Sequence, residues 1–184
     1  MTALITGIII FYSIHAIPHF APIKGRLQSS FGEKGYLAAF ALISAIGLGL
    51  MIYGKTTADY VHVWIGLMQL RHLTFLLVLV FFILLMAMII PCNIRRWVHH
   101  PMLFAFLSWS VGHLLVNGDL ASILFFGGFA VYSTFAIISA FNRGKRCALE
   151  KQPVWKDGLV IAVGAVLYVG VAKMHGVLFG VPLM

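Results

Sequence analysis

The chain has 184 residues, of which 61% are hydrophobic and 10% charged, and its formal net charge is +8. This composition excludes a soluble globular domain, because apolar stretches of about twenty residues recur and each can cross a bilayer. The basic excess does not indicate nucleic-acid binding, since most Lys and Arg residues stand in short loops, where they set membrane orientation. We therefore expect an all-α integral membrane protein with a single domain over residues 1–184.

Six transmembrane helices are predicted, and they form one bundle in a lipid bilayer. In chain order they cover about residues 3–20, 36–53, 73–90, 101–116, 120–141 and 159–177. No basic segment precedes the first helix and no small-residue cleavage site follows it, so we expect a retained helix there and not a signal peptide. Cys92 and Cys147 belong to no haem-attachment or zinc pattern and are expected to be reduced thiols.

Prolines and small residues mark the first two spans. Pro18 and Pro22 should kink or end the first span, because proline removes a backbone donor and clashes with the preceding turn. A basic loop is expected over residues 24–34. In the second span Ser44, Gly47 and Gly49 allow close helix contact.

Residues 60–72 mix apolar side chains with histidine, glutamine and arginine. This mixture favours either an interfacial helix or the buried first turns of a long third span.

The loop charges predict an orientation. The loops after spans one, three and five hold three, two and five of the 13 Lys and Arg residues, whereas those after spans two and four hold only Lys55. By the positive-inside rule, the odd-numbered loops are cytoplasmic and both termini lie on the non-cytoplasmic side.

Eight histidines are unusual in so apolar a chain, and only His15 and His113 lie clearly inside long apolar segments. A buried histidine needs a partner or a ligand. His15 and His19 would share a helix face and could bind a metal, but Pro18 stands between them. His99 and His100 stand at the basic start of a helix, and we expect them to be a solvated pair there.

Two interpretations of His113 stay open on residue chemistry. In the first, His113 bonds to a neighbouring helix and Gly112 serves helix packing. In the second, His15 and His113 bind the iron of one haem, and Gly112 clears space for the flat macrocycle. Asn117 lies one turn after His113, and Arg26 and Arg71 could pair with haem propionates.

Depth weakens the pairing of the two histidines. At about 1.5 Å per residue, His15 lies about 9 Å from the cytoplasmic end of its span and His113 about 18 Å from its own.

Enzyme motifs are sparse. The sequence contains no Gly-rich phosphate loop, H-E-x-x-H helix or G-x-S-x-G elbow. Asp119 follows the turn signal Asn117-Gly118, and this position favours a role as a helix cap over one as a general acid.

Three motifs resemble those of the NnrU family of membrane proteins. The first motif comprises His15, Pro18, Pro22, Arg26 and residues 31–36. The second comprises His100-Pro101 with residues 112–120, and the third comprises His175 with residues 180–182. The family is associated with nitrite and nitric oxide reduction, and it is similar to 15-cis-zeta-carotene isomerase, which holds a b-type haem through two histidines. The resemblance implies that these ligands fall on His15 and on His113, thirteen residues after His100.

The resemblance implies a haem b protein of the bacterial inner membrane that supports nitrite or nitric oxide respiration. Two alternatives stay open: a haem-dependent cis–trans isomerase of a polyene lipid, and a non-enzymatic assembly partner of a respiratory reductase or a small transporter. The isomerase has an arginine where this chain has His99, and it lacks the Leu-Leu-Val-Asn-Gly-Asp continuation. The resemblance to the isomerase therefore implies haem binding by this chain more directly than it implies isomerase activity.

Overall fold

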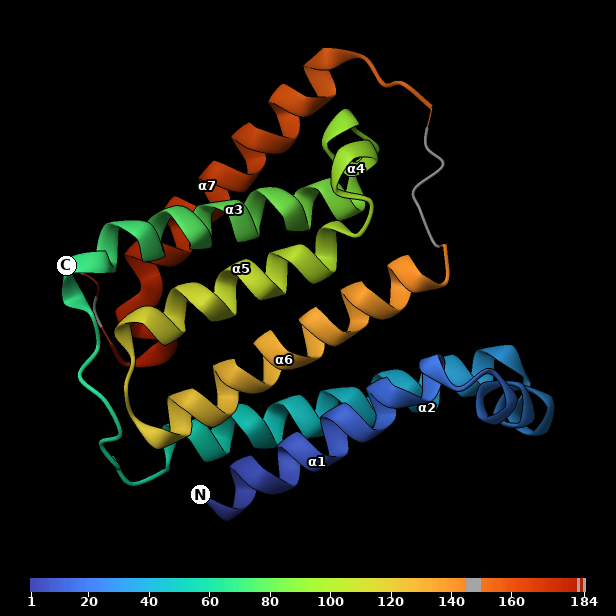
Figure 1. Ribbon diagram of the computed structural model, residues 1–184, viewed down its shortest axis with the longest axis horizontal. Coiled ribbons are helices and arrows are strands. Elements are labelled where there is room, and N and C mark those ends of the chain that lie inside the picture. Colours follow the sequence, from blue (N-terminus) through green and yellow to red (C-terminus); the bar gives the residue numbers. More distant parts are fainter. Residues whose placement is uncertain (145–149, 182, 184) are drawn as a thin grey trace. The chain divides into compact units, whose positions relative to one another are not determined.

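The computed structural model describes residues 1–144, 150–181 and 183, so predictions that concern Lys145, Arg146, Cys147 or Pro182 fall outside the described residues. Helices dominate the described part of the chain, and its only β pairing is an isolated bridge between His62 and Asp119. The elements are α1 (Thr2–Ala16), η1 (Ile17–His19), α2 (Ala21–Thr56), η2 (Met68–Leu70), α3 (Arg71–Ile89), α4 (Asn93–Val98), α5 (Pro101–Val116), α6 (Leu120–Asn142) and α7 (Val154–Phe179) (Figure 1).

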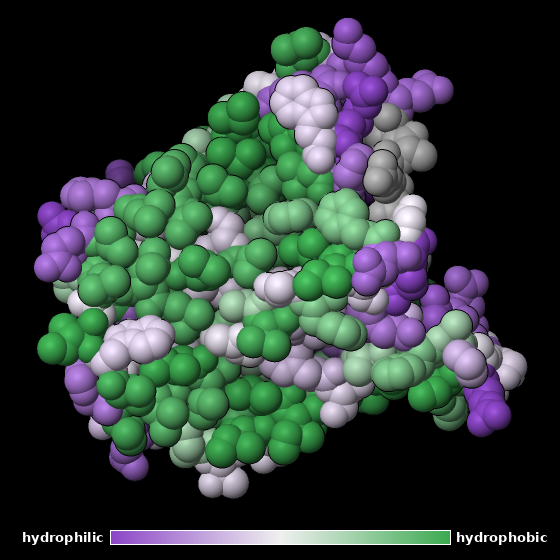
Figure 2. All heavy atoms as spheres, viewed as in Figure 1, coloured by the Kyte–Doolittle hydropathy of each residue, from purple (hydrophilic) through white to green (hydrophobic). Residues whose placement is uncertain are grey.

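Among the described residues, five helical segments are long and apolar enough to cross a membrane: α1 with η1, α2, η2 with α3, α6 and α7. The fourth predicted span corresponds to α5, a shorter apolar helix of 16 residues. Large apolar side chains lie exposed on the helices, as Figure 2 shows, and a bilayer is the solvent that suits them. The predicted all-helical membrane fold is confirmed.

The chain divides into two compact units. Unit 1 comprises Met1–His62 and Asp119–Phe125, and unit 2 comprises Val63–Gly118 and Phe126–Met184. Helix α6 therefore contributes its first residues to unit 1 and the rest to unit 2.

Unit 1 is built on α1 and α2, which pack antiparallel through glycines. A Cβ added to Gly54 would lie 2.1 Å from the Leu4 nitrogen, and one added to Gly47 would lie 2.9 Å from the Phe11 nitrogen. The two backbones thus touch, as small residues permit between membrane helices. The close contact predicted for Gly47 is confirmed, whereas Gly49 faces open space.

The expected break at Pro18 and Pro22 is confirmed, but the loop expected over residues 24–34 is wrong. Helix α1 ends at Ala16, and α2 begins at Ala21, so the basic residues after it are helical. Pro22 suits a first turn, where its missing N–H has no partner to lose. The chain bends instead at Gly32, whose φ of 69° and ψ of 163° are open essentially only to glycine.

Unit 2 places α3 between α5 and α7 (Figure 1). Two side chains join α3 to α5: the Thr74 hydroxyl donates to the Gly112 carbonyl at 2.9 Å, and the Ser108 hydroxyl to the Leu77 carbonyl at 2.7 Å. On the other side of α3, a Cβ on Gly164 of α7 would lie 2.8 Å from the Ile83 Cα. Each of these neighbours runs antiparallel to α3.

Cys92 is fully buried in an apolar cluster with Ala87 and Val160, where α3, α4 and α7 meet. Such a burial agrees with a structural thiol.

The helix expected within residues 60–72 is wrong for its first part, since residues 58–67 are not helical; helical structure begins with η2 and continues into α3 from Arg71. The backbone N–H groups of Val63 and Trp64 donate to the Gly118 carbonyl, and that of Leu67 donates to the Leu115 carbonyl. These bonds to the end of α5 replace the bonds of a helical turn. A Cβ on Gly66 would lie 2.2 Å from the Val116 oxygen, so the two backbones approach too closely for any side chain.

Candidate functional site

His113 lies in the last turn of α5 and is held by its own helix and by aromatic rings. Its Nδ1 lies 2.9 Å from the Trp109 carbonyl. A carbonyl only accepts, so Nδ1 carries the proton and the imidazole lone pair lies on Nε2, the nitrogen then suited to bind a metal. The ring stacks on Phe126 with centroids 4.4 Å apart and tilts against Trp109 at 5.2 Å.

Gly112 packs against α3. A Cβ there would lie 3.2 Å from the Leu77 Cβ and 3.4 Å from the Thr74 oxygen. The missing side chain lets α5 approach α3, as the packing interpretation expects. Its predicted second role, in making room for a macrocycle beside His113, stays a prediction.

Asn117 caps the end of α5. Its backbone N–H and its side-chain Nδ2 both donate to the His113 carbonyl, at 3.0 and 2.8 Å. The residue therefore fixes the last turn that carries His113, and a contact with a cofactor stays a prediction.

Asp119 caps α6, as predicted: the Ser122 N–H donates to its Oδ2 at 2.9 Å. Burial would raise the pKa of this carboxyl, but hydrogen bonds from Ser122 and the nearby charge of Lys55 lower it below its ordinary value. Asp119 is thus a structural anion, and not a group poised to donate a proton.

His15 repeats the arrangement of His113. It lies in the last turn of α1, and its Nδ1 donates to the Phe11 carbonyl at 2.7 Å, so its lone pair also lies on Nε2. Its ring stacks on Phe11, with centroids 4.0 Å apart, and lies 5.1 Å from the ring of Phe40. Each predicted ligand is thus a last-turn histidine with a fixed tautomer and aromatic neighbours.

Tyr36 is a candidate residue that sequence reasoning missed. It is 6% exposed, its ring lies 6.2 Å from that of Phe40, and its hydroxyl has no hydrogen-bond partner among the described residues. A buried hydroxyl without a partner is costly and calls for an explanation. In the sequence, the only signal for Tyr36 was its place in residues 31–36 of the first family motif.

The six predicted site residues divide between the units. Unit 2 gathers Arg71, Gly112, His113 and Asn117 at one end of the α3–α5 pair, where exposed Arg71 begins α3 one turn before Thr74. Unit 1 holds His15 on α1 and exposed Arg26 in the first segment of α2. His19 lies beyond the end of α1, so it does not share an unbroken helix with His15.

Within the described residues, no three His, Cys, Asp or Glu side chains gather to hold a metal ion.

A second structural feature that sequence reasoning missed joins α4 to α7. Asp157 accepts from the Asn93 N–H at 2.7 Å, from Asn93 Nδ2 at 2.7 Å and from the Ile94 N–H at 3.2 Å. Asn93 in turn donates to the Gln152 carbonyl and accepts from the Gln152 N–H. We call these three polar residues, Asn93, Gln152 and Asp157, the α4–α7 clasp.

The apolar helices, their glycine contacts and the histidines within them define a multi-helix membrane protein. Residues 3–183 match the family described as NnrU protein, and the chain belongs to that family. Neither the curated proteins nor the solved structures contain a match.

Proposed function

We propose that this protein binds haem b through His15 and His113 in the bacterial inner membrane and supports nitrite or nitric oxide respiration. One observation carries the proposal: both histidines direct Nδ1–H to the carbonyl four residues earlier and so hold the lone pair on Nε2. Membership of the NnrU family supports the physiological part.

The residues fit this cofactor in three respects. The neutral imidazoles of His15 and His113 would hold the haem iron, and the bond from each Nδ1–H to a backbone carbonyl would fix the ring and raise its basicity. The rings around His15 and His113 offer the apolar, aromatic walls that suit a macrocycle. The buried Tyr36 hydroxyl has no hydrogen-bond partner in the described part of the chain and could donate to a polar group of the cofactor.

The bound group would supply reversible one-electron chemistry at its iron. The chain's own part is to orient two imidazoles, to exclude water with Phe11, Phe126 and Trp109, and to place Arg26 and Arg71 as cations for carboxylates. Separately from the haem site, the loop charges favour an orientation with the loops after the odd-numbered spans in the cytoplasm and both termini opposite. The depths that this orientation gives His15 and His113 weaken their pairing, which the absorption spectrum tests.

An absorption spectrum of purified protein from haem-sufficient cells, oxidised and then reduced, tests the cofactor. We expect a Soret band that His15→Ala or His113→Ala reduces severely. His175→Ala is the matched control, because the Nδ1 of His175 also donates to a backbone carbonyl, that of Val181 at 2.6 Å, but this bond is exposed near the end of α7. A wild-type protein without a Soret band would refute haem binding.

Tyr36→Phe separates a cofactor contact from a structural one. Removing a hydroxyl that bonds to none of the described residues should not destabilise the apo fold, since no hydrogen bond seen there is lost. Haem should nevertheless dissociate faster from the variant. Unchanged haem retention would show that Tyr36 does not face the cofactor.

The physiological role is tested by complementing a deletion strain and measuring nitrite and nitric oxide consumption. We expect the double variant H15A/H113A to fail where H175A succeeds. Full rescue by the haem-free double variant would refute a haem-dependent role and would favour an assembly partner of a reductase.

A further inference from the structure

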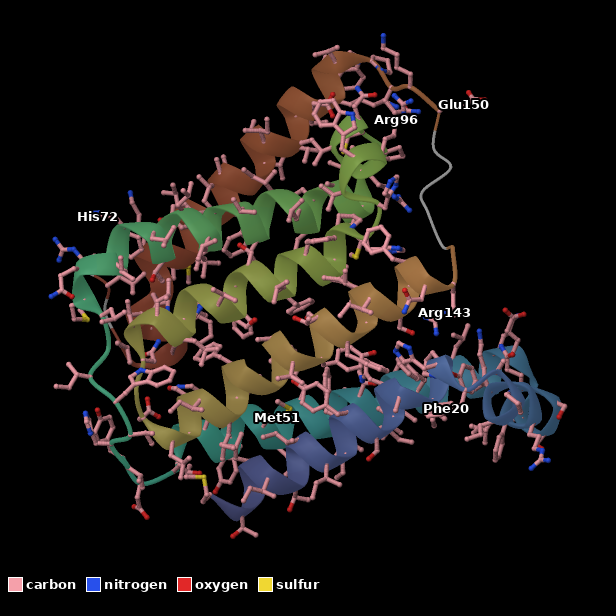
Figure 3. All side chains as sticks on the ribbon, viewed as in Figure 1. Phe20, Met51, His72, Arg96, Arg143 and Glu150 are labelled. Atoms are coloured by element: carbon pink, nitrogen blue, oxygen red, sulfur yellow. The ribbon has the colours of Figure 1, made fainter. Side chains whose placement is uncertain are left out.

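The end of unit 2 where α4 and α7 begin is rich in cations and exposed indoles. We name it the α4–α7 face and define it by Arg95, Arg96, Trp97, Lys151, Trp155 and Lys156. Trp97 is 78% exposed and Trp155 65% exposed. Figure 3 shows Arg96 on α4 at this end of the unit.

The α4–α7 clasp holds these side chains in place. Through Asp157 and Gln152, Asn93 ties the first turn of α4 to the segment that opens α7, and Asn93 itself is 7% exposed. Ile94 packs on the cluster around Cys92, whereas Trp97 is exposed. Arg95 and Arg96 are half-buried; one N–H of each donates within this end of the unit, to the Met88 carbonyl and to Asn93 Oδ1, and their other N–H groups stay available. The Lys156 ammonium donates to Gln152 at 2.8 Å, so its charge stays at the same end.

The level of this face in the membrane follows from the length of α3. Its 19 residues span about 29 Å, close to the roughly 30 Å of a bilayer's hydrocarbon core. The opposite end of α3 meets another exposed apolar group, with Trp64 44%, Ile65 82% and Met68 62% exposed. Unit 2 therefore carries tryptophan at both ends of a membrane-long helix, as the aromatic belts of membrane proteins do.

The charge of the face selects among lipids. Residues 93–98 and 150–157 contain four Lys and Arg residues against two acids, Glu150 and Asp157, and the Asp157 carboxylate is engaged by the α4 backbone. Exposure of two indoles to water is unfavourable, and burial of four cations in the hydrocarbon core of a bilayer costs still more free energy. Only the headgroup layer of a bilayer accommodates both, and a net positive face favours anionic headgroups there.

We propose that the α4–α7 face binds the phosphate headgroups of anionic phospholipids and anchors this end of unit 2 at the bilayer surface. The arginines supply planar donors for phosphate oxygens, and the indoles lie between headgroups and acyl chains. The face lies about 18 Å along α5 from His113, since α5 starts beside α4 and His113 is twelve residues after Pro101. Lipid binding is therefore separable from the proposed haem site.

Native mass spectrometry of the full-length protein in micelles with equal phosphatidylglycerol and phosphatidylcholine tests this inference. Wild-type protein should retain phosphatidylglycerol preferentially. Arg96→Gln and Lys151→Gln should each weaken that retention about fivefold, the effect expected of one cation near an anionic surface. Trp97→Ala should weaken retention of both lipids, because the indole contributes without regard to headgroup charge.

Lys173→Gln is the matched control. Lys173 is an exposed cation of α7 near its other end, so its loss changes the net charge equally but leaves the face intact. Equal retention of the two lipids by wild-type protein would overturn the proposal, and so would an equal effect of Lys173→Gln and Lys151→Gln. Displacement of phosphatidylglycerol by millimolar inorganic phosphate would identify free phosphate as the ligand and would also overturn it. Lys151 is exposed and forms no side-chain hydrogen bond with another described residue, so K151Q keeps the test valid even if R96Q folds poorly.

Discussion

The substitution Gly54→Ala tests whether α1 and α2 pack backbone to backbone. The added methyl would lie 2.1 Å from the Leu4 nitrogen and 2.6 Å from its Cα, whereas ordinary contact begins at 3.4 Å. Because the obstructing atoms are backbone, α1 must move by about 1.3 Å at this crossing. We expect a loss of about 2 kcal/mol in the free energy of unfolding, the middle of the range for overpacked cores.

The free energy of unfolding can be measured by reversible denaturation in mixed detergent micelles followed by circular dichroism. Gly49→Ala is the control on the same helix, because a Cβ there meets nothing within 4 Å. Both variants gain up to about 1 kcal/mol of helix propensity, so their difference isolates the clash. If G54A is as stable as G49A, the close approach of α1 to α2 is wrong.

Two further predictions concern the carboxylates. Asp157→Asn should destabilise unit 2 by about 1–2 kcal/mol, because an amide nitrogen would face Asn93 Nδ2 and the cap of α4 would weaken. The control is Glu150→Gln at an exposed site, which should leave thermal unfolding unchanged. Equal thermal stability of the two variants would refute the α4–α7 clasp. The lowered pKa of Asp119 contributes stability that is complete above its ordinary pKa of 3.8 and is lost as the pH falls through the lower folded value. Asp119→Asn should therefore reduce the fall of the free energy of unfolding with pH below about pH 4. An unchanged pH dependence would contradict the stabilisation attributed to the Asp119 carboxylate.

Local signals in the sequence predicted most of the helices. Pro18 and Pro22 ended α1 and began α2, and Gly180, with φ of 73°, ended α7. Asp119 was correctly placed as the cap of α6. These features depend on residues within one or two turns, so periodicity, proline and capping chemistry suffice to find them.

The fixed tautomers of His15 and His113 are also local, because each ring bonds to the carbonyl four residues earlier. The sequence alone could not reveal this bond, since a histidine in a helix can also direct its ring to a neighbouring helix or to a ligand. Their pairing on one haem stays a prediction with a spectroscopic test.

Contacts between distant segments decided the rest. Residues 58–67 are apolar enough for an interfacial helix, but the backbone bonds of Val63 to Gly118 and of Leu67 to Leu115 replace those of a helical turn. Asn93 and Asp157 are 64 residues apart, and no periodic pattern relates them. The sequence by itself determined that this is a helical membrane protein with two histidines inside apolar helices. Only the tertiary structure decided which backbone groups pair across the chain, because a polar group in an apolar medium takes whichever partner the packing brings within reach.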